Sequence, residues 1–235
     1  RQGLEELLPN PQVVKKEDGS FCLNESYKAL GQISSYCGNY NILLRAYAYL
    51  LTLGRDYLRQ AGMLSVLNAN YIKESLKAYY DLPIDGLCKH EFVFNGLKPE
   101  YGGEHSDPQH IRTLDVAKRL LDYGFHAPTL SFPVHETLMV EPTESEPKAE
   151  MDRFIATLIQ IKRECEEAAA SGEADNVVVN APHTAAEICG EWSHPYTREK
   201  AAFPLEFIRE SKFFPYVSKI DNGYGDRNLV CRCTE

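Results

Sequence analysis

Apolar residues recur at helical spacing in the first third of the chain, outside two short strand-like segments. The strand-like segments are Val13-Val14 and residues 21–23, which flank a turn at Asp18-Gly19. From residue 42 to residue 53 apolar side chains cover every face of a helix, which predicts a helix enclosed on all sides. Gly54 interrupts this run, and a second one follows at helical spacing: Leu64, Leu67, Tyr71, Leu76 and Tyr79.

The pattern changes after Pro83, where strand-forming and helix-forming segments begin to alternate. Residues 90–94 are aromatic and β-branched with partial alternation, which predicts a strand. Thr113 is placed to cap the N-terminus of a helix, and Gly124 suits the position just after its C-terminus. Two short strands are predicted next, at 130–134 and 137–140.

A long amphipathic helix completes this part of the chain. Thr143 and Glu146 match a capping box, with Ser145 as an alternative cap. The helix behind them carries an apolar stripe and closes at Ser171-Gly172: Met151, Phe154, Ile155, Leu158, Ile159 and Cys165. Strand, helix, strand pair and helix together predict a compact α+β module.

The remaining residues contain four prolines and many aromatic side chains, without a sustained period. Disordered tails lack aromatic residues, so we expect this segment to wrap over the body in extended form. The pattern of elements therefore predicts an α+β fold. Its predicted parts are the C-terminal edge of a larger domain (1–62), a linking helix (63–82), the small domain (83–175) and an extended C-terminal arm (176–235).

Composition narrows the classes of function. The 235 residues carry 25 Lys and Arg against 34 Asp and Glu, a net charge of −9, so the chain has no general electrostatic footprint for nucleic acid or an anionic membrane. The longest apolar run is about half of the roughly 20 residues that a membrane-spanning helix needs.

The chain opens without Met and without an apolar signal segment, so we expect no secretory signal and a fragment of something longer. Seven scattered cysteines without a C-x-x-C pair predict free thiols in a reducing compartment, and Cys231 and Cys233 are more simply explained as such thiols than as a redox pair.

Three clusters carry candidate chemistry, and each also has a purely structural explanation. Residues 34–39 precede a helix and could hold a phosphate, although an ordinary capped helix start is the simpler explanation. His90-Glu91 opens a strand and is most simply a polar pair on a solvent face. Glu141 ends an apolar strand, where a carboxylate must be exposed or paired. His105 and His110 have poor spacing for a helix-face metal site, and no metal site is expected.

At these clusters the chain resembles a known family. The resemblance rests on six blocks: residues 67–72 (LNANYI), 115–129 (DVAKRLLDYGFHAPT), 138–146 (LMVEPTESE), 180–184 (NAPHT), 194–199 (HPYTRE) and 224–231 (YGDRNLVC). The chain is similar to the glycine dehydrogenase (decarboxylating) family, the P-proteins of the glycine cleavage system. Residues 35–39 (SYCGN) resemble the version found in the second subunit of the split bacterial enzyme, which implies the C-terminal part of subunit 2.

The resemblance implies the C-terminal portion of a fold type I pyridoxal-phosphate enzyme, and hence the fold class α/β with a small α+β domain. Such an enzyme decarboxylates glycine on pyridoxal phosphate and passes the aminomethyl group to the lipoyl arm of the H-protein. The implied partners are glycine, the lipoylated H-protein and P-protein subunit 1, in an oligomer in the bacterial cytoplasm, with no nucleic acid and no membrane. The implied cofactor-binding residues are Ser34, Tyr36 and Asn39, and the candidates to face the substrate cleft are His90, His126, Thr129 and Glu141.

One departure limits the resemblance. The family's Schiff-base lysine lies in an H-K-T motif, and no His is followed by Lys in this sequence. We therefore expect no catalytic residue in this fragment and no activity of the isolated chain. The alternative hypothesis is a non-catalytic assembly module that docks the other subunit and the H-protein.

Overall fold

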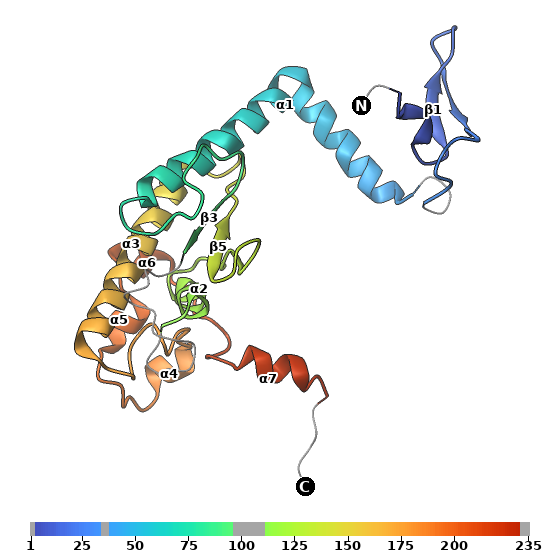
Figure 1. Cartoon of the computed structure of the whole chain (residues 1–235). Helices are drawn as coiled ribbons and strands as arrows, with labels where there is room; N and C mark the ends of the chain where they lie inside the picture. The colour runs from blue at the N-terminus through green and yellow to red at the C-terminus, as the bar shows by residue number, and fades with distance from the viewer. Residues whose placement is uncertain (1–2, 34–37, 96–110, 231–235) are drawn as a thin grey trace. The chain divides into compact units, whose positions relative to one another are not determined.

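A computed structural model describes residues 3–33, 38–95 and 111–230 (Figure 1). The chain divides into two compact units, Arg1–Arg59 and Gln60–Glu235. The long helix α1 (Tyr40–Leu76) contributes to both, and its helical backbone is interrupted at Gly54, where φ is 63° and ψ is −176°. This backbone conformation is accessible almost exclusively to glycine, so the sequence-based expectation of an interruption at this residue is confirmed.

The first unit contains a two-stranded antiparallel sheet and the first part of α1. Strands β1 (Gln12–Lys15) and β2 (Phe21–Asn24) pair in the register Val13 with Leu23, and a single 3-10 turn, η1 (Glu5–Leu7), precedes them. Both strands were predicted from the sequence. The enclosure predicted for residues 42–53 is not found, because apolar side chains on several faces of this helix are exposed in the described chain, Leu51 at 65% and Ile42 at 57%.

The second unit is built on a three-stranded antiparallel sheet in the order β3-β5-β4. Strand β5 (Thr137–Val140) is central and pairs with β3 (Phe92–Asn95) on one side and β4 (Thr129–Leu130) on the other. The helices α2 (Thr113–Asp122) and α3 (Lys148–Ser171) and the C-terminal part of α1 share one apolar core with this sheet. The predicted α+β arrangement of this part of the chain is confirmed.

Two predicted helix caps are wrong, the cap of α2 by one residue and the cap of α3 by four. Arg112 is the N-cap of α2, so Thr113 is its first helical residue and its hydroxyl donates instead to the Glu136 carbonyl at 3.2 Å. Helix α3 starts after Pro147, and Thr143 with Glu146 forms a turn, in which Glu146 N donates to Thr143 O. The reason is that Pro147 disfavours helical backbone angles at the residue before it, which keeps Glu146 out of the helix. Both C-terminal glycines behave as predicted, with φ of 83° at Gly124 and 66° at Gly172.

The C-terminal segment is more helical than expected. Four short helices interrupt it: α4 (Ala185–Cys189), α5 (Arg198–Ala202), α6 (Glu206–Ser211) and α7 (Asn222–Arg227). Side-chain caps explain three of them, since Thr184, Thr197 and Asp221 each accept a hydrogen bond from a backbone N–H of the first turn. Helices this short give no periodic signal, so the sequence pattern could not reveal them. Within the described residues, no helix has the length and apolarity required to cross a bilayer.

Candidate functional site

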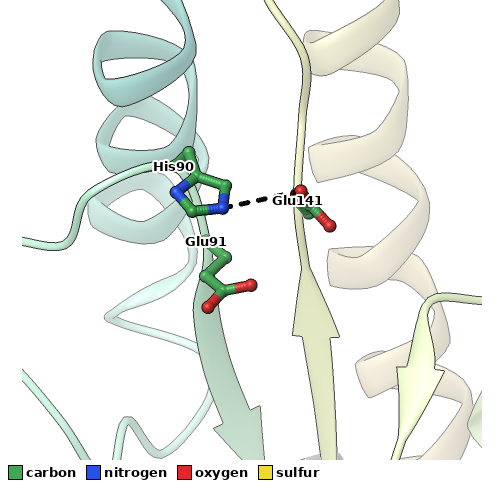
Figure 2. Close-up of side chains that lie close together, drawn as sticks. All are labelled: His90, Glu91 and Glu141. Carbon is green, nitrogen blue, oxygen red and sulfur yellow. Dashed lines mark ion pairs between the residues drawn. The ribbon is translucent and has the colours of Figure 1, made fainter. Parts of the chain in front are cut away.

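The best candidate site lies where strand β3 begins beside the end of strand β5 (Figure 2). Phe92 pairs with Val140 as the last pair of the ladder, so the next residues outward are Glu91 and Glu141. The side chains of His90, Glu91 and Glu141 converge at this end, and His90 Nε2 lies 3.6 Å from Glu141 Oε1. Both side chains of that pair are about half exposed, at 52% and 55%. Glu141 is thus both paired and exposed, the two outcomes that its place at the end of an apolar strand allowed.

A pocket of about 400 Å³ opens next to Glu141. Its apolar wall comes from α1, α3, β5 and the segment after α2: Ile72, Phe125, Met139, Val140, Met151 and Phe154. His126, Thr129 and Glu141 lie on its polar side, so three of the four predicted cleft residues line one pocket, and the fourth, His90, contacts Glu141. Whether this pocket faces the substrate stays a prediction.

The polar side of the pocket is acidic. Glu141, Glu146 and Glu150 line it, and among the described lining residues there is neither Lys nor Arg. Carboxylates attract cations and repel a phosphate dianion, and an imidazole and a carboxylate can both exchange protons. The pocket therefore favours a neutral or cationic group over an anionic one.

Of the three residues predicted to bind the cofactor phosphate, only Asn39 lies among the described residues. Ser34 and Tyr36 lie outside the described residues. Asn39 caps α1, because its Oδ1 accepts hydrogen bonds from the backbone N–H groups of Asn41 at 3.1 Å and Ile42 at 3.3 Å. Asn39 therefore serves as an ordinary helix cap, which was the simpler of the two explanations for this segment.

A buried charged network in the second unit was not anticipated from the sequence. All five N–H donors of Arg119 are used: two bonds reach Glu164, one reaches Asp122, and two reach the carbonyls of Lys200 and Ala201. These bonds measure 2.8–2.9 Å, and the three charged side chains are fully buried. A partial signal was present, since Glu164 falls within the apolar stripe of α3 beside Cys165, but its partner could not be identified from spacing alone.

The same network anchors the segment after residue 176 to helix α2. Asp122 accepts hydrogen bonds from the backbone N–H of His183 at 2.7 Å and from its Nδ1 at 2.8 Å. His183 Nε2 in turn lies 2.9 Å from the Tyr196 hydroxyl. Burial acts to raise the pKa of Asp122, but the hydrogen bonds from His183 and the charge of Arg119 outweigh it and hold the pKa below its usual value. Asp122 therefore stabilises the fold above the usual aspartate pKa, and this contribution is lost as the pH falls through its lowered pKa.

Lys212 provides a test of this anchoring through the pH dependence of stability. Its Nζ donates to the Asp122 carbonyl at 2.6 Å, and burial lowers its pKa to about 8. An unfolded lysine titrates near pH 10.4, so between these values the unfolded state binds more protons and stability rises with pH. We expect the stability of the natural chain relative to a Lys212→Met variant to rise by on the order of 1 kcal/mol from pH 7.5 to pH 10, after allowance for solvent screening.

Urea unfolding of both proteins across that pH range measures this difference, and the comparison cancels the titration of cysteines and other lysines. The Lys77→Met variant is the control, because Lys77 forms an exposed ion pair with Asp85. A pH-independent difference between the natural chain and Lys212→Met would show that Lys212 is not desolvated.

Comparisons with known proteins connect this chain to a family. Residues 61–183, just over half of the chain, match the family model described as glycine dehydrogenase, C-terminal domain. The chain is 48% identical over 204 residues to the glycine dehydrogenases (decarboxylating) of Yersinia enterocolitica and Yersinia pestis, covering 83% of this chain. It spans 20% of the length of these relatives.

A solved structure is also similar: the crystal structure of glycine decarboxylase (P-protein) of the glycine cleavage system in inhibitor-bound form, with a TM-score of 0.44 and 19% identity over 64% of this chain and 34% of that one. The match of the family model covers the sheet, α2, α3 and the candidate site of the second unit. On the match to this model and the identity to the curated relatives, the chain belongs to the glycine dehydrogenase C-terminal domain family.

Proposed function

We propose that these 235 residues form the C-terminal part of a glycine dehydrogenase (decarboxylating), the P-protein of a glycine cleavage system. The observation that carries this proposal is the 48% identity to curated glycine dehydrogenases, which extends over 83% of the chain. The whole enzyme would decarboxylate glycine with pyridoxal phosphate and transfer the aminomethyl group to the lipoyl arm of the H-protein. The short segment 35–39, which resembles the split bacterial enzyme, supports assignment to its subunit 2, with subunit 1 as a partner in an oligomer.

The described residues do not fit pyridoxal phosphate as a covalently held cofactor. Its aldehyde needs a lysine amine, and the described lining of the pocket contains none. Lys73 is buried, as a lysine that binds the cofactor would be. Its Nζ is already engaged, because it donates to the carbonyls of Asp85 at 3.2 Å and Gly86 at 2.6 Å. Three carboxylates around the pocket also oppose a phosphate group. The proposed function therefore requires that the lysine and the phosphate site of the fold type I enzyme come from protein outside these residues.

In the proposed enzyme this chain supplies one wall of the cleft. His126, Thr129 and Glu141 present an imidazole, a hydroxyl and a carboxylate to one pocket, and the imidazole of His90 contacts Glu141. Such groups can orient a small amino acid, and the imidazole and carboxylate can hold or accept a proton. The apolar wall behind them excludes water from part of that space. The bacterial relatives support a bacterial protein, and the free thiols of Cys22, Cys88, Cys165 and Cys189 are compatible with the cytoplasm.

Cofactor labelling tests the division of roles. We expect that incubation of the purified chain with pyridoxal phosphate, borohydride reduction and peptide mapping will label no single lysine stoichiometrically. The Yersinia pestis relative, treated in the same way, serves as the positive control and should show one dominant labelled lysine. Stoichiometric labelling of one lysine in this chain would place the cofactor here and overturn the proposed arrangement.

A chimaera tests the activity directly. Replacing the matching fifth of the Yersinia pestis enzyme with this chain should retain glycine-dependent exchange of labelled carbon dioxide, because the two sequences are 48% identical. In that chimaera, a Glu141→Gln change should reduce the exchange rate by about 100-fold or more if the carboxylate moves a proton. A folded, cofactor-loaded chimaera without exchange activity would contradict the proposed function.

A further inference from the structure

The ends of β3 and β5 bring two carboxylates together by the register of the sheet. In an antiparallel ladder, residues that face each other across the strands have side chains on the same face, about 4.5–5.5 Å apart at Cβ. Phe92 and Val140 form the last pair of the ladder, so Glu91 and Glu141 are the residues just beyond it on the two neighbouring segments. Phe92, Phe94 and Val140 are buried in the core and hold the adjoining strands in place. The backbone next to the two carboxylates is therefore fixed by packing.

The imidazole of His90 completes a three-ligand arrangement (Figure 2). His90 Nε2 lies 3.6 Å from Glu141 Oε1, and one ligand atom from each of His90, Glu91 and Glu141 lies within 4.8 Å of the others. Two ligand atoms that each lie about 2.1 Å from a tetrahedrally coordinated metal are themselves about 3.4 Å apart. The observed separation is therefore close to chelating geometry before any adjustment of these exposed side chains.

The negative charge of the two carboxylates also favours binding of a cation. Glu91 and Glu141 have carboxylate oxygens within 4.8 Å of each other, and two negative charges at this separation repel. Among the ion pairs of the described residues, Glu141 pairs with His90, and Glu91 takes part in none. An imidazole contributes at most one positive charge, and only when it is protonated. A divalent cation would balance both carboxylates and would use the neutral imidazole as a ligand.

We propose that His90, Glu91 and Glu141 form a binding site for a divalent transition-metal ion. One imidazole nitrogen with two carboxylate oxygens suits ions such as Mn²⁺ or Zn²⁺, which accept mixed nitrogen and oxygen ligands. Three protein ligands leave further positions for water or for an oxygen atom of a ligand in the adjacent pocket, since Glu141 lines both. His90 and Glu141 also belong to the proposed substrate cleft, but binding of an ion needs neither glycine nor pyridoxal phosphate and can be measured without them.

Titration of the full 235-residue chain with Mn²⁺, followed by electron paramagnetic resonance of the free ion, tests the site. Mn²⁺ is the appropriate probe because the seven cysteines would compete for softer ions such as Zn²⁺. We expect one saturable equivalent of bound Mn²⁺. The Glu91→Gln and Glu141→Gln variants keep the side-chain shape but remove a ligand charge. Loss of a residue that only supports a metal ligand typically weakens metal binding by about 10-fold or more, so loss of a ligand itself should weaken Mn²⁺ binding by at least about 10-fold.

The exposed pair His135 and Glu136 offers the matched control, because its imidazole lies 4.0 Å from a single carboxylate. The His135→Ala variant should bind Mn²⁺ like the natural chain, whereas His90→Ala should lose at least about 10-fold in affinity. Absence of a saturable equivalent, or equal loss in both histidine variants, would overturn the site.

Nuclear magnetic resonance provides a readout without any substitution. Substoichiometric Mn²⁺ should broaden the imidazole signals of His90 before those of His135 or His194. Uniform broadening of all exposed histidines would mean non-specific association and would also overturn the proposal.

Discussion

Replacement of Arg119 by methionine is expected to lower the free energy of unfolding of the second unit by about 3–5 kcal/mol. The variant keeps an apolar side chain of similar length but leaves Glu164 and Asp122 buried without their cation. It also removes the two hydrogen bonds to the carbonyls of Lys200 and Ala201, which hold α5 against α2. Urea or thermal unfolding followed by circular dichroism measures the loss.

Arg153→Met is the matched control for this prediction. Arg153 forms an ion pair of the same i,i+3 type with Glu150 at 3.3 Å, but both side chains are substantially exposed. Exposed pairs of this kind contribute about 0–1 kcal/mol, so this variant should unfold nearly as the natural chain does. If the two variants were equally stable, the buried network would not be a main support of this unit.

The second large effect is expected from Phe94→Ala, which should lower the free energy of unfolding by about 3–5 kcal/mol. Phe94 is fully buried in the middle of β3, faces Leu138 of β5 and contacts the Tyr80 ring edge-to-face with centroids 5.0 Å apart. Its removal leaves a cavity between the sheet and the helices that cover it. Because His90 and Glu141 lie just outside β3 and β5, a loosened ladder should also weaken Mn²⁺ binding.

Chemical denaturation of Phe94→Ala and of a Phe213→Ala control distinguishes cavity formation from the loss of an aromatic ring as such. Phe213 is 57% exposed, and its truncation should change stability by no more than about 0.5 kcal/mol. A Phe94→Ala variant as stable as the control would mean that the sheet is not packed as described.

The predictions that held were those governed by local rules. Gly54, Gly124 and Gly172 mark the interruption or end of a helix because their backbone conformations have positive φ, which favours glycine. Strand β5 was predicted at its exact residues, since its apolar run is short and bounded by turn residues. His126, Thr129 and Glu141 line one pocket, and their role at the substrate cleft, which the family resemblance implies, stays a prediction.

The predictions that failed depended on competition between local signals. Thr143 with Glu146 has the letters of a capping box, yet Pro147 prevents Glu146 from entering a helix and moves the start of α3 to Lys148. The short helices after residue 184 depend on single caps rather than on a period. Neither outcome can be deduced from the spacing of apolar residues.

By itself the sequence determined the order and type of the main elements, the helix stops and the family. Only the tertiary structure decided that Arg119 meets Glu164 from another helix and that Asp122 receives His183 from a segment 61 residues away. It likewise decided that His90 and Glu141, at the ends of two different strands, meet each other. The physical reason is that hydrophobic period and backbone propensity act over a few residues, whereas a buried charge is tolerated only where distant parts of the chain supply its partner.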